Sequence, residues 1–324
     1  MNNRSRNEQM TRVEYLESVV RMYYVLGLTQ NQIANQLGVS RSSVARLLEE
    51  AKKRGVIRFR INTTMEDFRS PSIEKKFLEN FALKDCVVFD LEKEIGNTFE
   101  YLTCSYLNSI LPLEGSVGIG FGHTLRSVGK SLNFFEPRPN LKFVQLTGGT
   151  GVDESIIPTS SNVQVFSQAL GSQSIFFPAP TIVGNPELKS LLLKDSSISA
   201  VVSAIRQVSM ALVGIGHTGH TNSVLSTYFP KDFLNQIPMK DSVGNILVHS
   251  YDINGRRTQQ DISKYLVGIE LEAFRQISLR VGIATGEDKI DAILGALRGN
   301  FANILITDKQ TSIEVLNKHS GGNI

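Results

Sequence analysis

The sequence has few cysteines and no long apolar run. Its two cysteines, Cys86 and Cys104, stand far apart and without a zinc-ligand spacing, which argues against structural zinc and suits a reducing compartment. No stretch reaches the roughly eighteen consecutive apolar residues of a membrane-spanning helix, and the N-terminus lacks the apolar segment of a secretory signal. We therefore expect a cytoplasmic protein without a membrane contact, a bound metal or another cofactor.

An excess of positive charge is absent outside the first fifth of the chain. Residues 1–60 contain 11 Lys and Arg against 5 Asp and Glu, whereas the remainder contains 23 against 26. A positive field in one small module is typical of nucleic-acid binding, because Lys and Arg displace the counterions condensed on phosphate, although a solvated basic face has the same composition. At 324 residues the chain exceeds one usual core, so we expect two domains.

The N-terminal segment has the pattern of a helix-turn-helix. Apolar residues recur every three or four positions over 11–26, which predicts one amphipathic helix that ends at Gly27. Thr29 can cap a second helix, and Ser40 can cap a third that runs to about Lys53. Two short helices joined by a turn that contains a glycine, here Gly38, are typical of this DNA-binding motif.

The polar surface of this motif carries short hydroxyls and guanidinium groups that can reach phosphates and base edges. The residues that we expect to contact double-stranded DNA are Thr29, Gln30, Ser40, Arg41, Ser42, Ser43 and Arg46. Lys52, Lys53 and Arg54 either touch phosphate or only favour the C-terminus of their helix through its dipole. We expect no catalytic residue among them.

The pattern changes after this motif. Residues 56–61 alternate apolar and basic side chains and predict a short strand in the position of a wing. Turn formers mixed with charge make residues 62–72 the best linker. The expected division is therefore a DNA-binding domain at 1–61, a linker at 62–72, and a larger second domain at 73–324.

The C-terminal part predicts an α/β fold. Seven apolar runs alternate with helical stretches, which is typical of a doubly wound, mostly parallel sheet with helices on both faces. The runs are CVVFD, SVGIGF, LKFVQLT, SIFFPA, ALVGIG, ISLRVGIA and NILIT. In such sheets, ligands bind beyond the carboxyl ends of the strands, so the residues that follow each run are the candidate site.

Three of these strand ends suggest anion binding. The first and second are glycine-rich and carry hydroxyls, and they contribute Gly122, His123 and Thr124, and Gly148, Gly149 and Thr150. At the third, Lys289 lies in the first turn of a helix, where the helix dipole disfavours a cation unless an anion is near. Tight turns need glycine in any case, and Lys289 could simply be exposed, so the residue pattern leaves both interpretations open.

The order of these motifs resembles the SorC family of bacterial sugar-responsive regulators, with LsrR-type regulators as near relatives. The segments that carry the resemblance span nearly the whole chain: LTQNQIANQLGVSRSSVARLLEEAKKRGVIRFRI, VGIGFGHTL, VQLTGG, VGNILVHSYDINGR and ATGEDKIDAILGALRGNFANILITD. The resemblance implies a C-terminal domain similar to ribose-5-phosphate isomerase and glucosamine-6-phosphate deaminase, retained as a sensor without catalysis.

The resemblance also implies a partner and a mechanism. It implies a homotetramer or homodimer on operator DNA of a carbohydrate utilisation operon, whose DNA affinity changes when a sugar or sugar phosphate binds. His123, Thr124 and the loop of Gly148, Gly149 and Thr150 would face this effector, and Lys289 would reach its phosphate. The chain departs from the family at Asn245, where an acidic residue is usual, so its effector could differ.

Two rival functions remain open. The segment VGIGHTGHTNS resembles the deaminase loop with a catalytic histidine, here His220, so an active sugar-phosphate isomerase or deaminase with a DNA-binding appendage is the alternative. The deaminase Asn-Glu pair is absent, which favours a plain loop histidine, and His217 with His220 has no nearby third metal ligand. The second rival is a constitutive DNA binder whose large domain serves only oligomerisation. The several loops on one sheet edge that could bind an anion argue against it.

Overall fold

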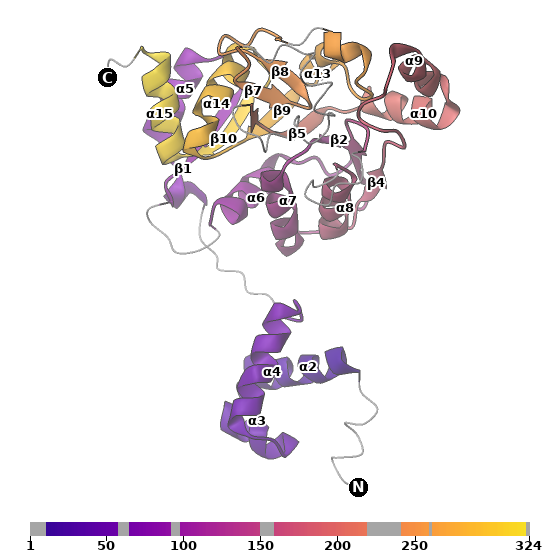
Figure 1. The fold of residues 1–324 in the computed structure, drawn as a ribbon. Helices are drawn as coiled ribbons and strands as arrows, with labels where there is room; N and C mark the ends of the chain where they lie inside the picture. Colours follow the sequence, from indigo (N-terminus) through magenta and orange to yellow (C-terminus); the bar gives the residue numbers. More distant parts are fainter. Residues whose placement is uncertain are drawn as a thin grey trace. The chain divides into compact units, whose positions relative to one another are not determined.

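The computed structural model (Figure 1) describes residues 11–57, 65–91, 98–149, 159–218, 241–258 and 261–321. The chain divides into two units, Met1–Thr63 and Thr64–Ile324. The end of the expected wing strand and the start of the expected linker lie outside the described residues. Residues 65–72, which the sequence assigned to the linker, are ordered in the larger unit, because Phe68 of the 3-10 turn Met65–Phe68 is buried there and Pro71 opens a helix.

The smaller unit is helical. Its elements are α2 (Arg12–Val20), the π-helix η1 (Arg21–Val25), α3 (Gln30–Leu37) and α4 (Arg41–Lys53). Thr11 and Glu14 cap α2 reciprocally, and Thr29 and Gln32 cap α3 in the same way. The predicted first helix is therefore present, but its last turn widens to a π-helix before Gly27.

The turn between α3 and α4 has the predicted geometry. Gly38 ends α3 in the left-handed conformation with φ of 66°, and the Ser40 hydroxyl accepts a hydrogen bond from the Ser43 N–H at 3.1 Å to begin α4. The three helices share one apolar core, formed by Leu16, Val19, Ile33, Ala34, Val44, Leu47, Leu48 and Ala51. The predicted helix-turn-helix is thus confirmed as a packed unit with its own core.

The larger unit contains a parallel sheet of seven strands in the order β1-β10-β9-β5-β2-β3-β4. The strands are β1 (Asp85–Phe89), β2 (Gly115–Ile119), β3 (Leu141–Gln145), β4 (Gln173–Ile175), β5 (Met210–Gly214), β9 (Leu279–Ile283) and β10 (Ile304–Asp308). Each of the seven predicted apolar runs supplies one strand, so the predicted α/β fold is confirmed. The run at β4 pairs for only three residues and stops ahead of Pro178, which has no N–H to donate.

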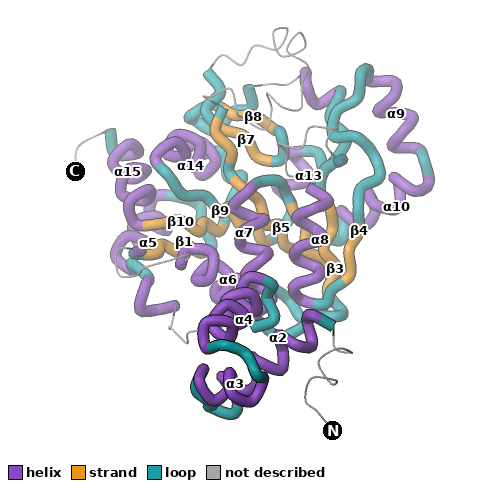
Figure 2. The backbone as a smooth tube through the Cα atoms, turned by 60° about the horizontal axis from the view of Figure 1, so that its bottom comes forward, coloured by secondary structure: helices purple, strands orange, loops and turns teal. Residues whose placement is uncertain are grey.

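Helices cover both faces of this sheet, as the near-continuous apolar strands require. Side chains alternate along each strand, so that Val88 of β1 enters one core and Val87 the other. On one face, α6 (Thr98–Ile110), α7 (His123–Ser131) and α8 (Thr159–Leu170) lie across the strands (Figure 2). The other core includes residues of α5 (Pro71–Asn80), α10 (Ser196–Ile205), α13 (Leu271–Arg275), α14 (Ile290–Arg298) and α15 (Lys309–His319). The helix α9 (Pro186–Lys194) precedes α10.

A small antiparallel sheet lies over the carboxyl end of the main one. It contains β6 (Gly216–His217), β7 (Gly244–Ile246) and β8 (His249–Tyr251), in that order. Leu247 and Val248 form the turn between β7 and β8 with φ of 50° and 64°, a conformation that a β-branched residue rarely adopts. Both side chains are buried, so packing holds this strained turn in place.

Candidate functional site

The strand order reverses between two neighbouring strands of the sheet. From β2 the chain continues outward to β3 and β4, whereas from β5, which pairs with β2, it continues in the opposite direction to β9 and β10. Ligands of open α/β sheets bind in the crevice beyond the carboxyl ends at this point. A cavity of 310 Å³ lies here, lined by Phe121, Gly122, His123, Thr124, Val213, Gly214, Ile215, Gly216, His217, Asn245, Leu247, Ile283, Ala284, Thr285 and Lys289.

Two strand-to-helix turns of the same kind flank this cavity. Gly122 follows β2 and precedes α7, and Gly286 follows β9 and precedes the 3-10 turn η6 (Glu287–Lys289), with φ of 121° and 112°. Only glycine adopts this conformation without strain, which explains the glycine at each strand end. The helix α7 therefore begins at the cavity, with His123 and Thr124 among the lining residues, and helix geometry leaves its first N–H groups without partners inside the helix.

Asn162 of α8 holds the first of these turns in place. Its side chain is fully buried, and its Nδ2 donates to the carbonyl oxygens of Gly120 and Gly122, each at 3.2 Å. The residue supports the cavity from behind without lining it. Sequence reasoning missed Asn162, because nothing in a helix sequence shows that one amide faces a loop 40 positions earlier. It also missed Thr285, although Thr285 directly follows the β9 run and that position was a usable signal.

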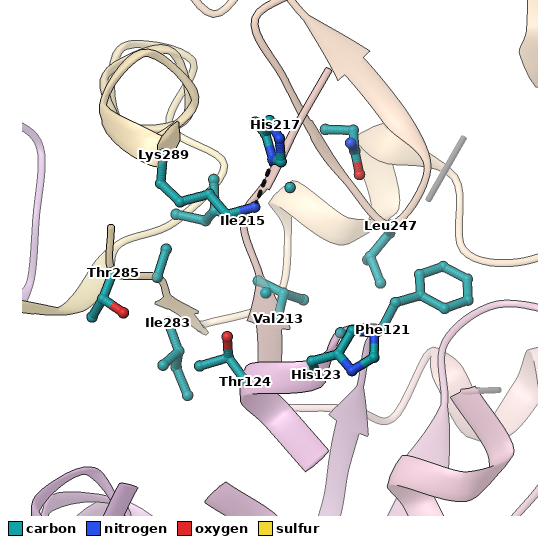
Figure 3. Close-up of a pocket in the computed structure, with 15 residues that line it drawn as sticks. Phe121, His123, Thr124, Val213, Ile215, His217, Leu247, Ile283, Thr285 and Lys289 are labelled. Carbon is teal, nitrogen blue, oxygen red and sulfur yellow. Dashed lines mark hydrogen bonds between the residues drawn. The ribbon is translucent and has the colours of Figure 1, made fainter. Parts of the chain in front are cut away.

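Lys289 and His217 meet at the cavity (Figure 3). They belong to η6 and β6, and Lys289 Nζ lies 2.9 Å from His217 Nδ1, with the two side chains pointing toward each other. Asp288 lies beside them, its Oδ2 4.0 Å from Lys289 Nζ and 3.5 Å from His217 Nδ1. Burial lowers the pKa of Lys289 and the Asp288 carboxylate partly opposes this. The Lys289 ammonium is thus poorly solvated, which favours its pairing with a second anion.

Asn245 presents an unused polar group to the same cavity. Its side chain is only 5% exposed, and its Nδ2 has no hydrogen-bond partner among the described residues. A buried donor without a partner is destabilising by about 1 to 3 kcal/mol. A ligand oxygen placed beside Asn245 would remove this penalty.

The charges of the cavity favour an anion. None of the described residues that line it is an aspartate or glutamate, whereas the lining includes Lys289 and two histidines. Its 310 Å³ lie at the small end of the range of ligand pockets, roughly 300 to 1,000 Å³. The arrangement can hold one small molecule with an anionic group and hydrogen-bonding oxygens.

The structure brings together some of the residues proposed from the sequence and not others. Gly122, His123, Thr124, Asn245 and Lys289 all line the cavity. Gly148 and Gly149 are not among the lining residues, and their N–H groups donate to the carbonyl oxygens of Val267 and Ala179 at 2.9 and 2.7 Å. Their backbone donors are therefore used within the protein. Thr150 lies outside the described residues.

The expected DNA-contacting residues occupy two kinds of position in the smaller unit. Thr29, Gln30 and Arg41 line a shared surface recess, and Ser42 and Arg46 are exposed on α4. The Ser40 hydroxyl accepts from the Ser43 N–H, and the two hydroxyls lie 2.8 Å apart, so both residues help to begin α4. The remaining exposed polar atoms lie where a recognition helix presents its N-terminal half to DNA.

The described residues contain no cluster of three or more His, Cys, Asp or Glu side chains that could hold a metal ion. His220, proposed as the alternative catalytic histidine and as a metal ligand together with His217, lies outside the described part of the chain. No helix among the residues that the structure describes is long and apolar enough to cross a membrane.

Comparison with protein families assigns both units. Residues 66–317 match the family described as "Putative sugar-binding domain", and residues 12–69 match the Crp-like helix-turn-helix domain. Together the two matches cover nearly all of the described chain.

Individual relatives match along almost their full length. The chain is 30% identical over 319 residues to the transcriptional regulator LsrR of Enterobacter sp. strain 638, covering 95% of this chain and 94% of the relative. It is 26% identical over 301 residues to the deoxyribonucleoside regulator of Bacillus subtilis, covering 92% and 95%. These relatives are named as regulators, and their matches include both units.

A solved structure matches the chain over both units. The full-length sorbitol operon regulator SorC from Klebsiella pneumoniae matches with a TM-score of 0.67 and 26% identity, covering 94% of this chain and 99% of the other. The family models therefore identify a helix-turn-helix followed by a sugar-binding domain, and the relatives and the solved structure match the chain along both. The chain belongs to the SorC family of transcriptional regulators, which join a helix-turn-helix to a C-terminal sugar-binding domain.

Proposed function

We propose that a sugar or sugar phosphate in the cavity at the ends of β2, β5 and β9 controls the affinity of the helix-turn-helix for operator DNA of a carbohydrate utilisation operon. The observation that carries the proposal is the cavity itself. It lies at the switch point of the sheet, and the described residues that line it include the Lys289 ammonium and no carboxylate. Lys289 would bind the phosphate, and Asn245, His123 and Thr124 would contact the remaining oxygens of the effector.

The comparisons support a sensor in place of an enzyme, because the relatives are named as transcriptional regulators. The lysine and the two histidines of the cavity are themselves groups that can give and take protons, so turnover has to be measured. We propose that the bound effector is released unchanged, and turnover of the compound by the purified protein would contradict this.

The coupling requires two states of the protein. The effector must bind the DNA-competent and DNA-incompetent states unequally, by about 1 to 3 kcal/mol for a useful switch. Helix-turn-helix modules usually read paired half-sites, so we propose that the protein acts in the cytoplasm as a homodimer or homotetramer on double-stranded DNA. Light scattering of the purified protein at several concentrations tests this part.

The first experiment is a thermal-shift screen of the purified full chain against sugar phosphates, free sugars and polyols. A ligand that binds only the folded state raises the melting temperature. We expect a selective shift with one sugar phosphate, lost in Lys289→Ala and kept in the control Lys130→Ala, whose lysine is exposed near the C-terminal end of α7. The compound must then change the affinity for a DNA fragment selected from genomic DNA by the protein. If no compound does both, the proposal fails.

A further inference from the structure

The contact between His217 and Lys289 determines which of the two facing nitrogen atoms carries the proton between them. An ammonium group can only donate hydrogen bonds. Lys289 Nζ lies 2.9 Å from His217 Nδ1, so this nitrogen accepts and carries no proton when Lys289 is charged. The two side chains are only 20% and 23% exposed, so the protein around them fixes the contact more than solvent does.

An anion that enters the cavity favours a hydrogen-bond donor at His217 Nδ1 in place of an acceptor. Its oxygens compete for the protons of Lys289, and the lone pair of Nδ1 would then face negative charge. Binding one proton from water turns Nδ1 into a donor and the imidazole into a cation. Lys289 and His217 could then each donate to a different oxygen of the same tetrahedral anion.

We propose that His217 couples anion binding in the cavity to the uptake of one proton, so that the effector binds more tightly as the pH falls. His217 acts as a positioning residue for Lys289 in the empty protein and as a second cationic donor in the complex. The proposal deepens the function proposed above, because it rests on an anionic effector. The only bond that forms is the N–H bond at Nδ1, and its proton leaves an O–H bond of the solvent.

The charged groups around His217 agree with this scheme. The Asp288 carboxylate, 3.5 Å from Nδ1, favours a protonated imidazole, whereas Lys289 opposes it until an anion separates the two cations. The described residues of β7 carry no charge. Among the described residues, the elements that contact β6 carry these other ionisable side chains: Glu287 on η6, and Asp291 and Arg298 on α14, where Asp291 pairs with Lys318 at 2.6 Å. His123 lines the same cavity.

Sulfate is the probe for this proposal, because it is a tetrahedral dianion that does not titrate in the range where histidine does, unlike phosphate. Calorimetric titration of the full chain would follow sulfate binding between about pH 5 and pH 8 at constant ionic strength set with chloride. We expect the dissociation constant to fall by up to about tenfold for each pH unit on going to lower pH. Titrations in two buffers of different ionisation enthalpy count the protons directly and need no variant.

Two variants separate His217 from its neighbours. His217→Asn keeps an acceptor for Lys289 near the position of Nδ1 but cannot take up a proton, so sulfate binding should persist with a flat pH dependence. His123→Asn removes the other histidine of the cavity and should keep the slope, even where it changes the affinity. The melting temperature of each variant shows whether it is folded.

The proposal is overturned if wild-type sulfate binding is independent of pH, if His217→Asn keeps the slope, or if sulfate does not bind at any pH. These results differ from failure of the proposed function. If a sugar phosphate changes DNA affinity while sulfate binding takes up no proton, only the proposed role of His217 is wrong. If sulfate binds with the expected slope and no sugar or sugar phosphate changes DNA affinity, the sensor function falls and the proton-linked anion site stands.

Discussion

Gly216 and Asn245 lie against each other across the β6–β7 pair, so closely that a β-carbon on Gly216 would stand 2.8 Å from Asn245 Nδ2. Both residues line the cavity. The missing side chain at position 216 is therefore what allows the Asn245 amide to occupy its place. This pair links a residue type in β6 directly to the shape of the candidate effector site.

Replacing Gly216 by alanine should weaken effector binding while the protein stays folded. The added methyl group must displace the Asn245 side chain, and such overpacking typically raises the free energy of the folded state by about 1 to 3 kcal/mol. We expect about tenfold or greater loss of affinity for the sugar phosphate identified by thermal shift, measured by calorimetry. Gly184→Ala is the matched control, because a β-carbon there meets nothing within 4 Å. Equal affinities in the two variants would show that the Asn245 position does not matter.

Asn245→Asp should change which compounds bind. The substitution places a carboxylate in a cavity whose described lining has none, so it should disfavour anionic effectors and favour compounds whose hydroxyl groups donate hydrogen bonds to that carboxylate. We expect a smaller thermal shift with sugar phosphates and a larger one with free sugars or polyols. Asn245→Ser, which adds no charge to the cavity, should preserve the wild-type order of compounds. An unchanged order in Asn245→Asp would remove Asn245 from the specificity of the site.

Asn162→Asp should impair the cavity from outside it. A carboxylate cannot donate to the carbonyl oxygens of Gly120 and Gly122, which the Asn162 amide now binds at 3.2 Å. The loop before α7 should then be held less firmly. Leaving a buried acceptor without its hydrogen bond typically raises the free energy of the folded state by about 1 to 3 kcal/mol, so effector affinity should fall by about tenfold or more. Calorimetry measures the affinity, and circular dichroism checks the fold. Wild-type affinity in a folded Asn162→Asp protein would contradict the supporting role.

Arg46→Ala and Lys289→Ala should separate the two activities. Arg46 is exposed on α4, and Lys289 lines the cavity of the other unit. Arg46→Ala should weaken DNA binding by about 1 to 3 kcal/mol if the guanidinium contacts a base edge, with no change in effector affinity. Lys289→Ala should abolish the effector response and keep DNA binding. Fluorescence anisotropy with labelled DNA measures both, and Arg206→Ala, an exposed arginine of the larger unit, is the control. Parallel losses in both variants would argue against a modular sensor.

His249 should make the fold less stable as the pH falls. Its burial lowers its pKa from 6.5 to about 4 in the folded protein. Below about pH 6.5 the unfolded chain therefore binds more protons than the folded one, so stability is lost as the pH falls from about 6.5 toward 4. Between pH 7 and pH 5 this group should lower the free energy of unfolding by about 2 kcal/mol.

Urea unfolding at the two pH values tests this expectation. Other carboxylates also titrate, so the measured quantity is the difference between the wild type and His249→Gln, which can still donate to the carbonyl oxygen that now lies 3.2 Å from His249 Nε2. The variant should lose less stability on acidification than the wild type. Equal losses in both proteins would show that His249 is not responsible.

The sequence by itself determined the features that depend on neighbouring residues. Thr29, Gly38 and Ser40 punctuate the helix-turn-helix as predicted, because a cap satisfies backbone groups within three or four positions of itself. The seven apolar runs became the seven strands for a similar reason, since a strand buried on both faces needs a continuous apolar stretch. The glycines at 122 and 286 also follow from local geometry.

Only the tertiary structure decided which strand ends face the cavity. The loop of Gly148 and Gly149 has the composition of an anion-binding turn, yet its N–H groups pair with the backbone of residues 179 and 267, which the sequence places far away. The contact of His217 with Lys289 and the support from Asn162 join positions 72 and 40 apart, respectively. Strand order brings such residues together, and strand order depends on which long-range pairs bury the most apolar surface, a quantity that no local pattern contains.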